Sequence, residues 1–145
     1  MHIGIYHGYE LTGSGSNEYT RYLAKTLSSL GHEVHVICRE PFPETLSFVS
    51  KAYTWDPQGN NALLFEREVL HDDCVIHQLP HASIRPVYVT DKQREGNVKP
   101  FVSLTDDELD KYHRLNSILI EKILTQEKID ILHANHLVYQ PIAAV

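Results

Sequence analysis

The first 38 residues carry the pattern that most restricts the fold: an apolar strand, a loop with glycines, a helix and a second apolar strand. The strands are predicted at residues 2–7 and at Glu33–Cys38. The helix follows the loop Leu11–Ser16 and ends at Gly31, a residue that commonly closes helices. A crossover of one helix joins parallel strands. We therefore expect an α/β fold, an open parallel sheet with helices on both faces.

The helix of this first unit should turn an apolar face toward the sheet. Ser16 is its predicted N-cap, and Glu18 complements the positive end of the helix dipole. Apolar side chains recur three and four residues apart along the helix. The predicted core-facing positions are Tyr19, Tyr22, Leu23, Leu27 and Leu30, with Thr26 as a marginal member.

The remainder of the chain predicts fewer elements. Prolines and glycines interrupt residues 39–70, where only a short helix over Leu63–Leu70 is expected. A long helix is predicted from Thr105, which forms a capping-box pair with Glu108. Its expected core face comprises Leu109, Tyr112, Asn116, Leu119, Ile120 and Ile123, widened by Leu115 and Ile118. Further strands are predicted at Val75–Leu79, Val87–Val89 and Asp130–Ala134.

Composition excludes several classes of protein. The 145 residues suffice for one domain, and 42% hydrophobic with 22% charged residues is ordinary for a globular chain. A net charge of −6 argues against nucleic-acid binding, which needs a basic surface. Two cysteines, Cys38 and Cys74, are too few for a disulfide-stapled secreted domain. With no secretory signal and no membrane-spanning run in view, we expect a cytoplasmic protein.

The chain stops where a further helix is expected. Residues 143–145 come shortly after Pro141, and an open α/β sheet normally covers its last strand with a helix. We therefore expect residues 1–145 to be a single N-terminal domain, truncated at its C-terminal end, of a longer protein. The alternative is that Val145 is a natural end that frays.

Two segments are candidate functional sites. The loop Gly13–Ser16 precedes a helix N-terminus, where free N–H groups attract anions and glycines allow a ligand to approach the backbone. Residues 133–136, with His133, Asn135 and His136, follow a predicted strand. If the strands are parallel, both segments lie at the carboxyl edge of the sheet, where such folds bind ligands. A histidine there can accept a proton or bind a hydroxyl group.

The same loop does not match the common nucleotide motifs. After Gly13 and Gly15, Glu18 stands where a dinucleotide fingerprint requires a third glycine, and no Gly-Lys-Ser or Gly-Lys-Thr follows.

Four histidine and cysteine residues have a spacing that resembles that of metal ligands, but they do not predict a metal site. Residues three apart in a strand face opposite sides of the sheet, so the ligand atoms do not converge. That set is His71, Cys74, His77 and His81, and we expect neither a metal ion nor a cofactor.

Two stretches resemble family-4 glycosyltransferases of the GT-B fold. Residues 3–38 have the order of elements that opens those enzymes, including a closing Leu-Gly-His-Glu-Val at residues 30–34. The stretch DILHANHLVYQPIAA at residues 130–144 resembles the family's strand that ends in a His-x-His-like motif before a helix. The matches cover roughly the first 38 and last 16 residues, and the middle is not diagnostic.

The resemblance implies a Rossmann-like N-terminal domain that holds the acceptor of a sugar-transfer reaction. The family moves a sugar from a nucleotide-sugar donor to an acceptor hydroxyl with retention at the anomeric carbon. Its glycine loop, which reaches toward the donor, matches Gly13, Ser14, Gly15 and Ser16. The family's histidine near the reacting sugar falls within residues 133–136. Asn135 departs from a strict His-x-His, so His133, Asn135 and His136 all stay candidates.

The resemblance also places the donor-binding domain, with its Glu-x7-Glu region, beyond Val145. Residues 1–145 alone should then be inactive, because nothing stabilises the departing nucleotide diphosphate. The acceptor remains open: a sugar, a lipid-linked molecule that would bring peripheral membrane contact, or a small molecule. Two alternatives to sugar transfer are another GT-B enzyme, such as a nucleotide-sugar epimerase, and a stand-alone ligand-binding module.

Overall fold

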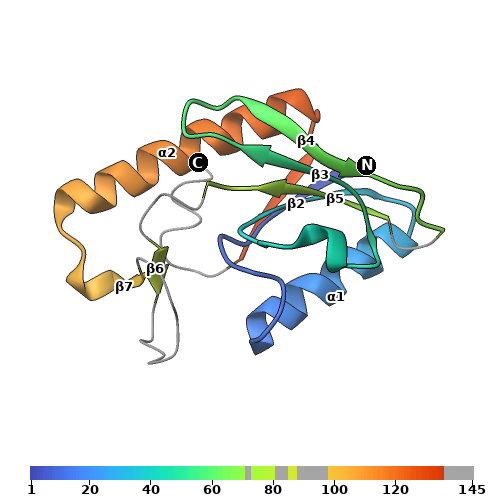
Figure 1. Ribbon diagram of the computed structural model, residues 1–145, viewed down its shortest axis with the longest axis horizontal. Coiled ribbons are helices and arrows are strands. Elements are labelled where there is room, and N and C mark those ends of the chain that lie inside the picture. The colour runs from blue at the N-terminus through green and yellow to red at the C-terminus, as the bar shows by residue number, and fades with distance from the viewer. Residues whose placement is uncertain (71–72, 81–84, 88–97, 136–145) are drawn as a thin grey trace.

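The computed structural model describes residues 1–70, 73–80, 85–87 and 98–135, and its main feature is a six-stranded sheet (Figure 1). The strand order is β4-β3-β5-β2-β1-β8. β1 (His2–Tyr6) lies between β2 (Glu33–Cys38) and β8 (Ile131–Ala134) and is parallel to both. The fold is therefore α/β with a mostly parallel sheet, as the sequence predicts at this level.

The far side of the sheet departs from the prediction. β5 (Cys74–Gln78) is parallel to β2 and to β3 (Val49–Trp55), but the edge strand β4 (Asn61–Glu66) is antiparallel to β3. The helix predicted over Leu63–Leu70 is wrong. The turn before β4 explains why: the Asp56 carboxylate accepts the N–H groups of Gln58 and Asn60, and this turn makes β3 and β4 a hairpin.

Two further strands form a small parallel sheet. β6 (Arg85–Val87) pairs with β7 (Val98–Pro100). β6 begins two residues before the predicted strand Val87–Val89, of which residues 88 and 89 lie outside the described part. Short 3₁₀ turns, η1 (Pro43–Thr45) and η2 (Phe101–Ser103), complete the elements seen in the described ranges.

Two helices cover opposite faces of the sheet (Figure 1). α1 is Gly15–Ser29, and its N-cap is Ser14 instead of the predicted Ser16: the Ser14 hydroxyl accepts the N–H of Asn17. α2 is Asp106–Gln126, and the predicted capping box of Thr105 and Glu108 is confirmed. In the part of the chain that the structure describes, no helix is long and apolar enough to cross a membrane.

Each face of the sheet has its own apolar core. Side chains alternate along β1 and β2, so Ile3, Ile5, Val34 and Val36 pack on the α1 side, whereas Tyr6 and Ile37 pack on the α2 side. The core face of α2 is largely as predicted: its buried residues are Tyr112, Asn116, Leu119, Ile120 and Ile123. Ile118, predicted to widen that face, is exposed.

The face of α1 that meets the sheet was predicted only in part. Tyr19, Tyr22 and Leu30 are each more than half exposed, at 57%, 60% and 69%. The buried residues of α1 are Asn17, Thr20 and Ala24 instead, with Leu23 and Leu27 partly buried. Two polar residues lie on the inner face because polar groups at the ends of β1 and β8 are there to meet them. This exchange of apolar for polar contacts marks the candidate site described below.

The faces of α2 can be tested with two isoleucines on the same helix. Ile123→Ala should lower the free energy of unfolding by about 2–5 kcal/mol, because it opens a cavity in the core. The matched control Ile118→Ala removes the same atoms at an exposed position and should change stability by less than about 0.5 kcal/mol. Urea denaturation of both variants measures the difference; equal losses would show that the helix is packed in another orientation.

Candidate functional site

The carboxyl ends of β1 and β8 lie side by side. Tyr6 is in register with Ala134, and the N–H of Asn135 donates to the carbonyl of Tyr6 at 2.9 Å. The chain passes from β1 to β2 on one side and reaches β8 on the other, so the strand order reverses here. Open α/β sheets bind ligands outside the carboxyl ends of the strands at such a switch point. His7 and Asn135, the first residues after these strands, therefore occupy the expected location of a site.

A buried polar cluster fills this location. Its members, His7, Asn17, Thr20 and Asn135, are each less than 10% exposed. His7 Nε2 is 3.0 Å from Asn17 Oδ1, and His7 Nδ1 is 3.1 Å from Thr20 Oγ1. The amide of Asn135 donates to Thr20 Oγ1 at 2.5 Å and to His7 Nδ1 at 3.2 Å. Buried polar groups are retained at little cost only when they are bonded in this way.

The cluster connects the two segments predicted from the sequence. His133 and Asn135 are two residues apart and project to the same side of β8, and His133 Nε2 lies 2.7 Å from Asn135 Oδ1. On the other side, the amide of Asn17 donates to the carbonyl of Thr12, in the loop before Gly13, at 2.5 Å. The third predicted residue, His136, lies outside the described residues.

Two residues that follow β2, Arg39 and Glu40, hold the loop that ends at Ser14 in place. Leu11 is fully buried, and its N–H donates to the buried carboxylate of Glu40 at 2.9 Å. The N–H of Arg39 donates to the carbonyl of Tyr9 at 2.9 Å. These bonds hold the loop against the end of β2.

The glycines of the loop face open space. A side chain carbon added at Gly13 or Gly15 would meet no atom within 4 Å. Gly13 has a φ of +86°, which favours glycine, whereas Gly15 is the first residue of α1 and has no positive φ. Gly15 is therefore the position where a methyl group tests close approach by a ligand without straining the backbone.

Sequence reasoning missed His7, Asn17 and Thr20. His7 directly follows the first strand, as His133 and Asn135 do the last, and this shared position was the available signal. Asn17 and Thr20 lie on the buried face with Ala24, three and four residues apart. A search for apolar periodicity passes over such residues, because it assigns polar side chains to the solvent side.

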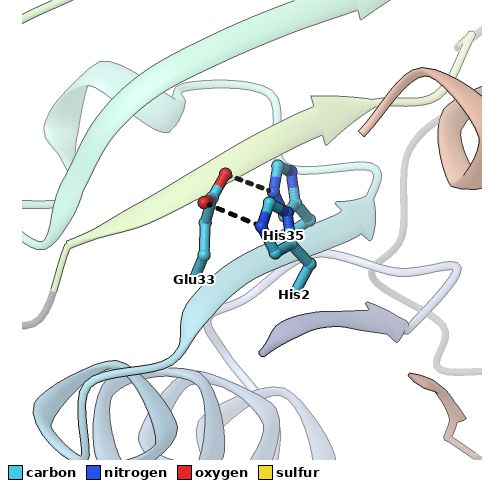
Figure 2. A group of neighbouring side chains, drawn as sticks. All are labelled: His2, Glu33 and His35. Carbon is cyan, nitrogen blue, oxygen red and sulfur yellow. Dashed lines mark hydrogen bonds and ion pairs between the residues drawn. The ribbon is translucent and has the colours of Figure 1, made fainter. Parts of the chain in front are cut away.

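A second cluster of histidines lies on the α2 face, near the amino ends of β1 and β2. Figure 2 shows His2, Glu33 and His35: His35 Nε2 is 3.1 Å and His2 Nε2 is 3.5 Å from the Glu33 carboxylate. Deeper in the core, His35 Nδ1 is 3.1 Å from His77 Nε2. Glu127 at the end of α2 lies 3.9 Å from His35 Nδ1. Two sets of three residues thus have the ligand spacing of a metal site: His2, Glu33 and His35, and His35, His77 and Glu127.

Hydrogen bonding in this cluster opposes a metal ion. Trp55 Nε1–H, which can only donate, points at His77 Nδ1 at 3.2 Å. In its neutral form His77 then carries its proton on Nε2 and donates to His35 Nδ1, and His35 carries its proton on Nε2 and donates to Glu33. The ring nitrogens of His35 and His77 are therefore all in use: each one either carries a proton or already accepts a hydrogen bond. None of them is free to bind a metal ion in either set. Metal-bound histidines show the opposite pattern, donating their second N–H outward.

Burial favours the neutral form of His35 and His77. Desolvation, together with a smaller effect of the neighbouring His35, lowers the pKa of His77 to about 3. Desolvation also lowers the pKa of His35, against the opposing attraction of Glu127 and Glu33. The earlier metal-like set is confirmed not to converge where it can be followed: Cys74 packs on the α1 side and His77 faces the α2 side, and His71 and His81 lie outside the described residues.

A hollow of about 870 Å³ lies at the opposite edge of the sheet, lined in part by Glu33, Val34, Lys51 and Val75 at the amino ends of their strands. Parallel sheets place ligands at the carboxyl ends, so the polar cluster at β1 and β8 is the stronger candidate.

Comparison of the chain with protein-family models, curated proteins and solved structures gave no significant match.

Stability should fall in acid because of His77. Between its ordinary pKa of 6.5 and its folded value of about 3, the unfolded chain binds a proton that the folded protein excludes. The free energy of unfolding is therefore highest above pH 6.5 and decreases as the pH falls toward 3, by up to about 1.4 kcal/mol per pH unit for one histidine. Urea titrations followed by fluorescence of Trp55, the only tryptophan, measure this slope.

The variant His77→Gln should lose that part of the slope, whereas His32→Gln, at a half-buried position outside the core, should keep it. An unchanged slope in His77→Gln would contradict the assignment.

Zinc should leave the wild-type melting temperature unchanged in the micromolar range, because binding would require the Trp55 bond to break. Thermal denaturation with Zn²⁺ and with EDTA tests this expectation. A rise of several degrees with Zn²⁺ that is lost in His35→Gln would show a metal centre at this cluster.

Proposed function

We propose that this chain is the acceptor-side domain of a retaining glycosyltransferase, with the reaction at the carboxyl ends of β1 and β8. The observation that supports the proposal most is a continuous chain of hydrogen bonds. It runs through Asn17 and His7 and joins the loop before Gly13 to the strand end at residues 133–135. These are the two segments on which the resemblance to family-4 enzymes rests, although they are separated by more than 100 residues.

The chemistry of the cluster suits a neutral, hydroxyl-rich ligand. Its side chains are amides, a hydroxyl and imidazoles, which donate and accept hydrogen bonds without a fixed charge. His133 is exposed beside the buried Asn135. The open space over Gly13 and Gly15 leaves room for a donor to approach the start of α1, where free N–H groups favour phosphate oxygens.

In this proposal the domain supplies one wall of the reaction cleft. A nucleotide diphosphate leaves during transfer, and its charge needs donors that a second domain would provide. Residues 1–145 would bind and orient the acceptor and contact the transferred sugar, without turnover of their own. No metal ion or organic cofactor takes part.

The product of the complete reading frame that encodes this chain is the protein to assay. It should release nucleotide diphosphate from one of the UDP-, GDP- or ADP-sugars and form a glycoside of retained anomeric configuration, as judged by NMR. Conversion of the donor to its epimer without transfer would favour the epimerase alternative. Binding without any turnover by the complete product would favour a ligand-binding module.

Gly15→Ala is the sharpest variant for this site. The added methyl meets open space at the first residue of α1, so the melting temperature should stay the same or rise slightly. Turnover should fall at least about tenfold, the effect of a clash worth roughly 1.4 kcal/mol in the transition state. Ser29→Ala, at the exposed far end of the same helix, is the matched control and should keep full activity. Full activity in Gly15→Ala would remove the loop from the site.

A further inference from the structure

The hydrogen bonds of the buried polar cluster have a direction that two backbone carbonyls determine. The carbonyl of Thr12 can only accept, so the Asn17 atom beside it must be the NH₂ group. Asn17 then presents Oδ1 to His7, which must carry its proton on Nε2 to donate there. His7 Nδ1 is left as an acceptor.

The other end of the cluster gives the same direction. Thr20 has one hydroxyl proton, and two groups beside it can only accept: the carbonyl of Ser16 at 2.9 Å and Nδ1 of His7 at 3.1 Å. Whichever of them takes the proton, the Thr20 oxygen must accept from Asn135. The NH₂ group of Asn135 therefore faces Thr20 and His7 Nδ1, and its Oδ1 faces His133. His133 must carry its proton on Nε2 to complete the 2.7 Å contact.

We infer that His7 and Asn17 are positioning residues, which orient the Asn135 amide and thereby leave Nδ1 of His133 as the unprotonated nitrogen that meets a ligand hydroxyl. The chain of donors runs from His133 through Asn135 and His7 to Asn17 and the loop carbonyl of Thr12. A change at His7 or Asn17 that reverses the direction of these bonds would therefore alter which nitrogen of His133 can accept a proton. The use of that nitrogen toward a sugar hydroxyl depends on the proposed function, whereas the protonation pattern does not.

Burial explains why the pattern is stable. His7 and Thr20 are fully buried, and Asn17 and Asn135 are 5% and 7% exposed, so water cannot replace a broken bond. Turning the Asn135 amide over would place its oxygen against the Thr20 oxygen and against the lone pair of His7 Nδ1, both of which accept from its NH₂ group. Each of these two mismatches costs a buried group its hydrogen bond, whereas the exposed His133 would adapt by moving its proton to Nδ1.

The first measurement is the protonation state of the two histidines in the uniformly ¹⁵N-labelled 145-residue chain at pH 7.5. Two-bond proton–nitrogen correlation spectra distinguish the tautomers, and loss of signals in His133→Gln and His7→Phe assigns them. We expect Nε2–H in both His7 and His133. Nδ1–H in His133 of the wild-type chain would overturn the inference.

The second measurement separates positioning from a general structural role. His7→Phe fills a similar volume without an acceptor, so one side-chain amide proton of Asn135 loses its partner. Its exchange with water should accelerate at least tenfold, and His133 should show both tautomers. Asn17→Asp keeps an acceptor for His7 Nε2–H but cannot donate to Thr12. It should loosen the amides of Gly13–Ser16 while leaving the Asn135 amide protected.

His32→Gln, beyond the C-terminal end of α1, is the control and should change none of these signals. Unchanged Asn135 exchange and an unchanged His133 spectrum in folded His7→Phe would overturn the positioning role of His7. In the complete enzyme, His7→Phe should lower kcat more than it raises KM. A normal His133 tautomer in a protein without transferase activity would leave this inference intact and reject the proposed function.

Discussion

The parallel pairing of β1 with strands on both sides is the constraint on which the rest of the structure depends. Because Tyr6 is in register with Ala134, the next residues of the two strands, His7 and Asn135, are brought together from opposite ends of the chain. The position of β1 inside the sheet also gives each face its own helix. Gly4 permits this arrangement at the α2 face, where an added side chain would lie 3.1 Å from Ile129 and Leu132 at the entry to β8.

Strong local signals made the elements at both ends of the chain predictable. The alternation of Ile3 and Ile5 with the opposite face, and the capping box at Thr105, hold in the structure because they depend on residues close in sequence. The β3–β4 hairpin was not predicted, because β4 is an exposed edge strand whose residues lack a two-residue alternation in burial. Its formation depends on pairing with β3 and on the Asp56 turn.

The prediction of the candidate site failed in one informative way. The loop and the strand end were found from their places after a strand and before a helix, which follow from topology. Asn17 and Thr20 were not found in this way. Asn17 is buried against His7, and Thr20 against Asn135, which is more than 100 residues away in the sequence. Local apolar periodicity instead selected Tyr19 and Tyr22, which are exposed. A helix can bury polar residues in place of apolar ones when their hydrogen bonds are satisfied, and such places are often functional.

The two histidine networks show how one group of fixed polarity can set the chemistry of a distant one. Trp55 can only donate, and its bond to His77 leads through His35 to a proton directed at Glu33. The carbonyl of Thr12 can only accept, and its bond to Asn17 leads through His7 and Asn135 to an unprotonated nitrogen on His133. The first chain ends with its donor already paired to a carboxylate, which suits a structural role. The second ends at the exposed side chain of His133, whose Nδ1 keeps an unprotonated lone pair, and this makes it the better candidate of the two networks for contact with a ligand.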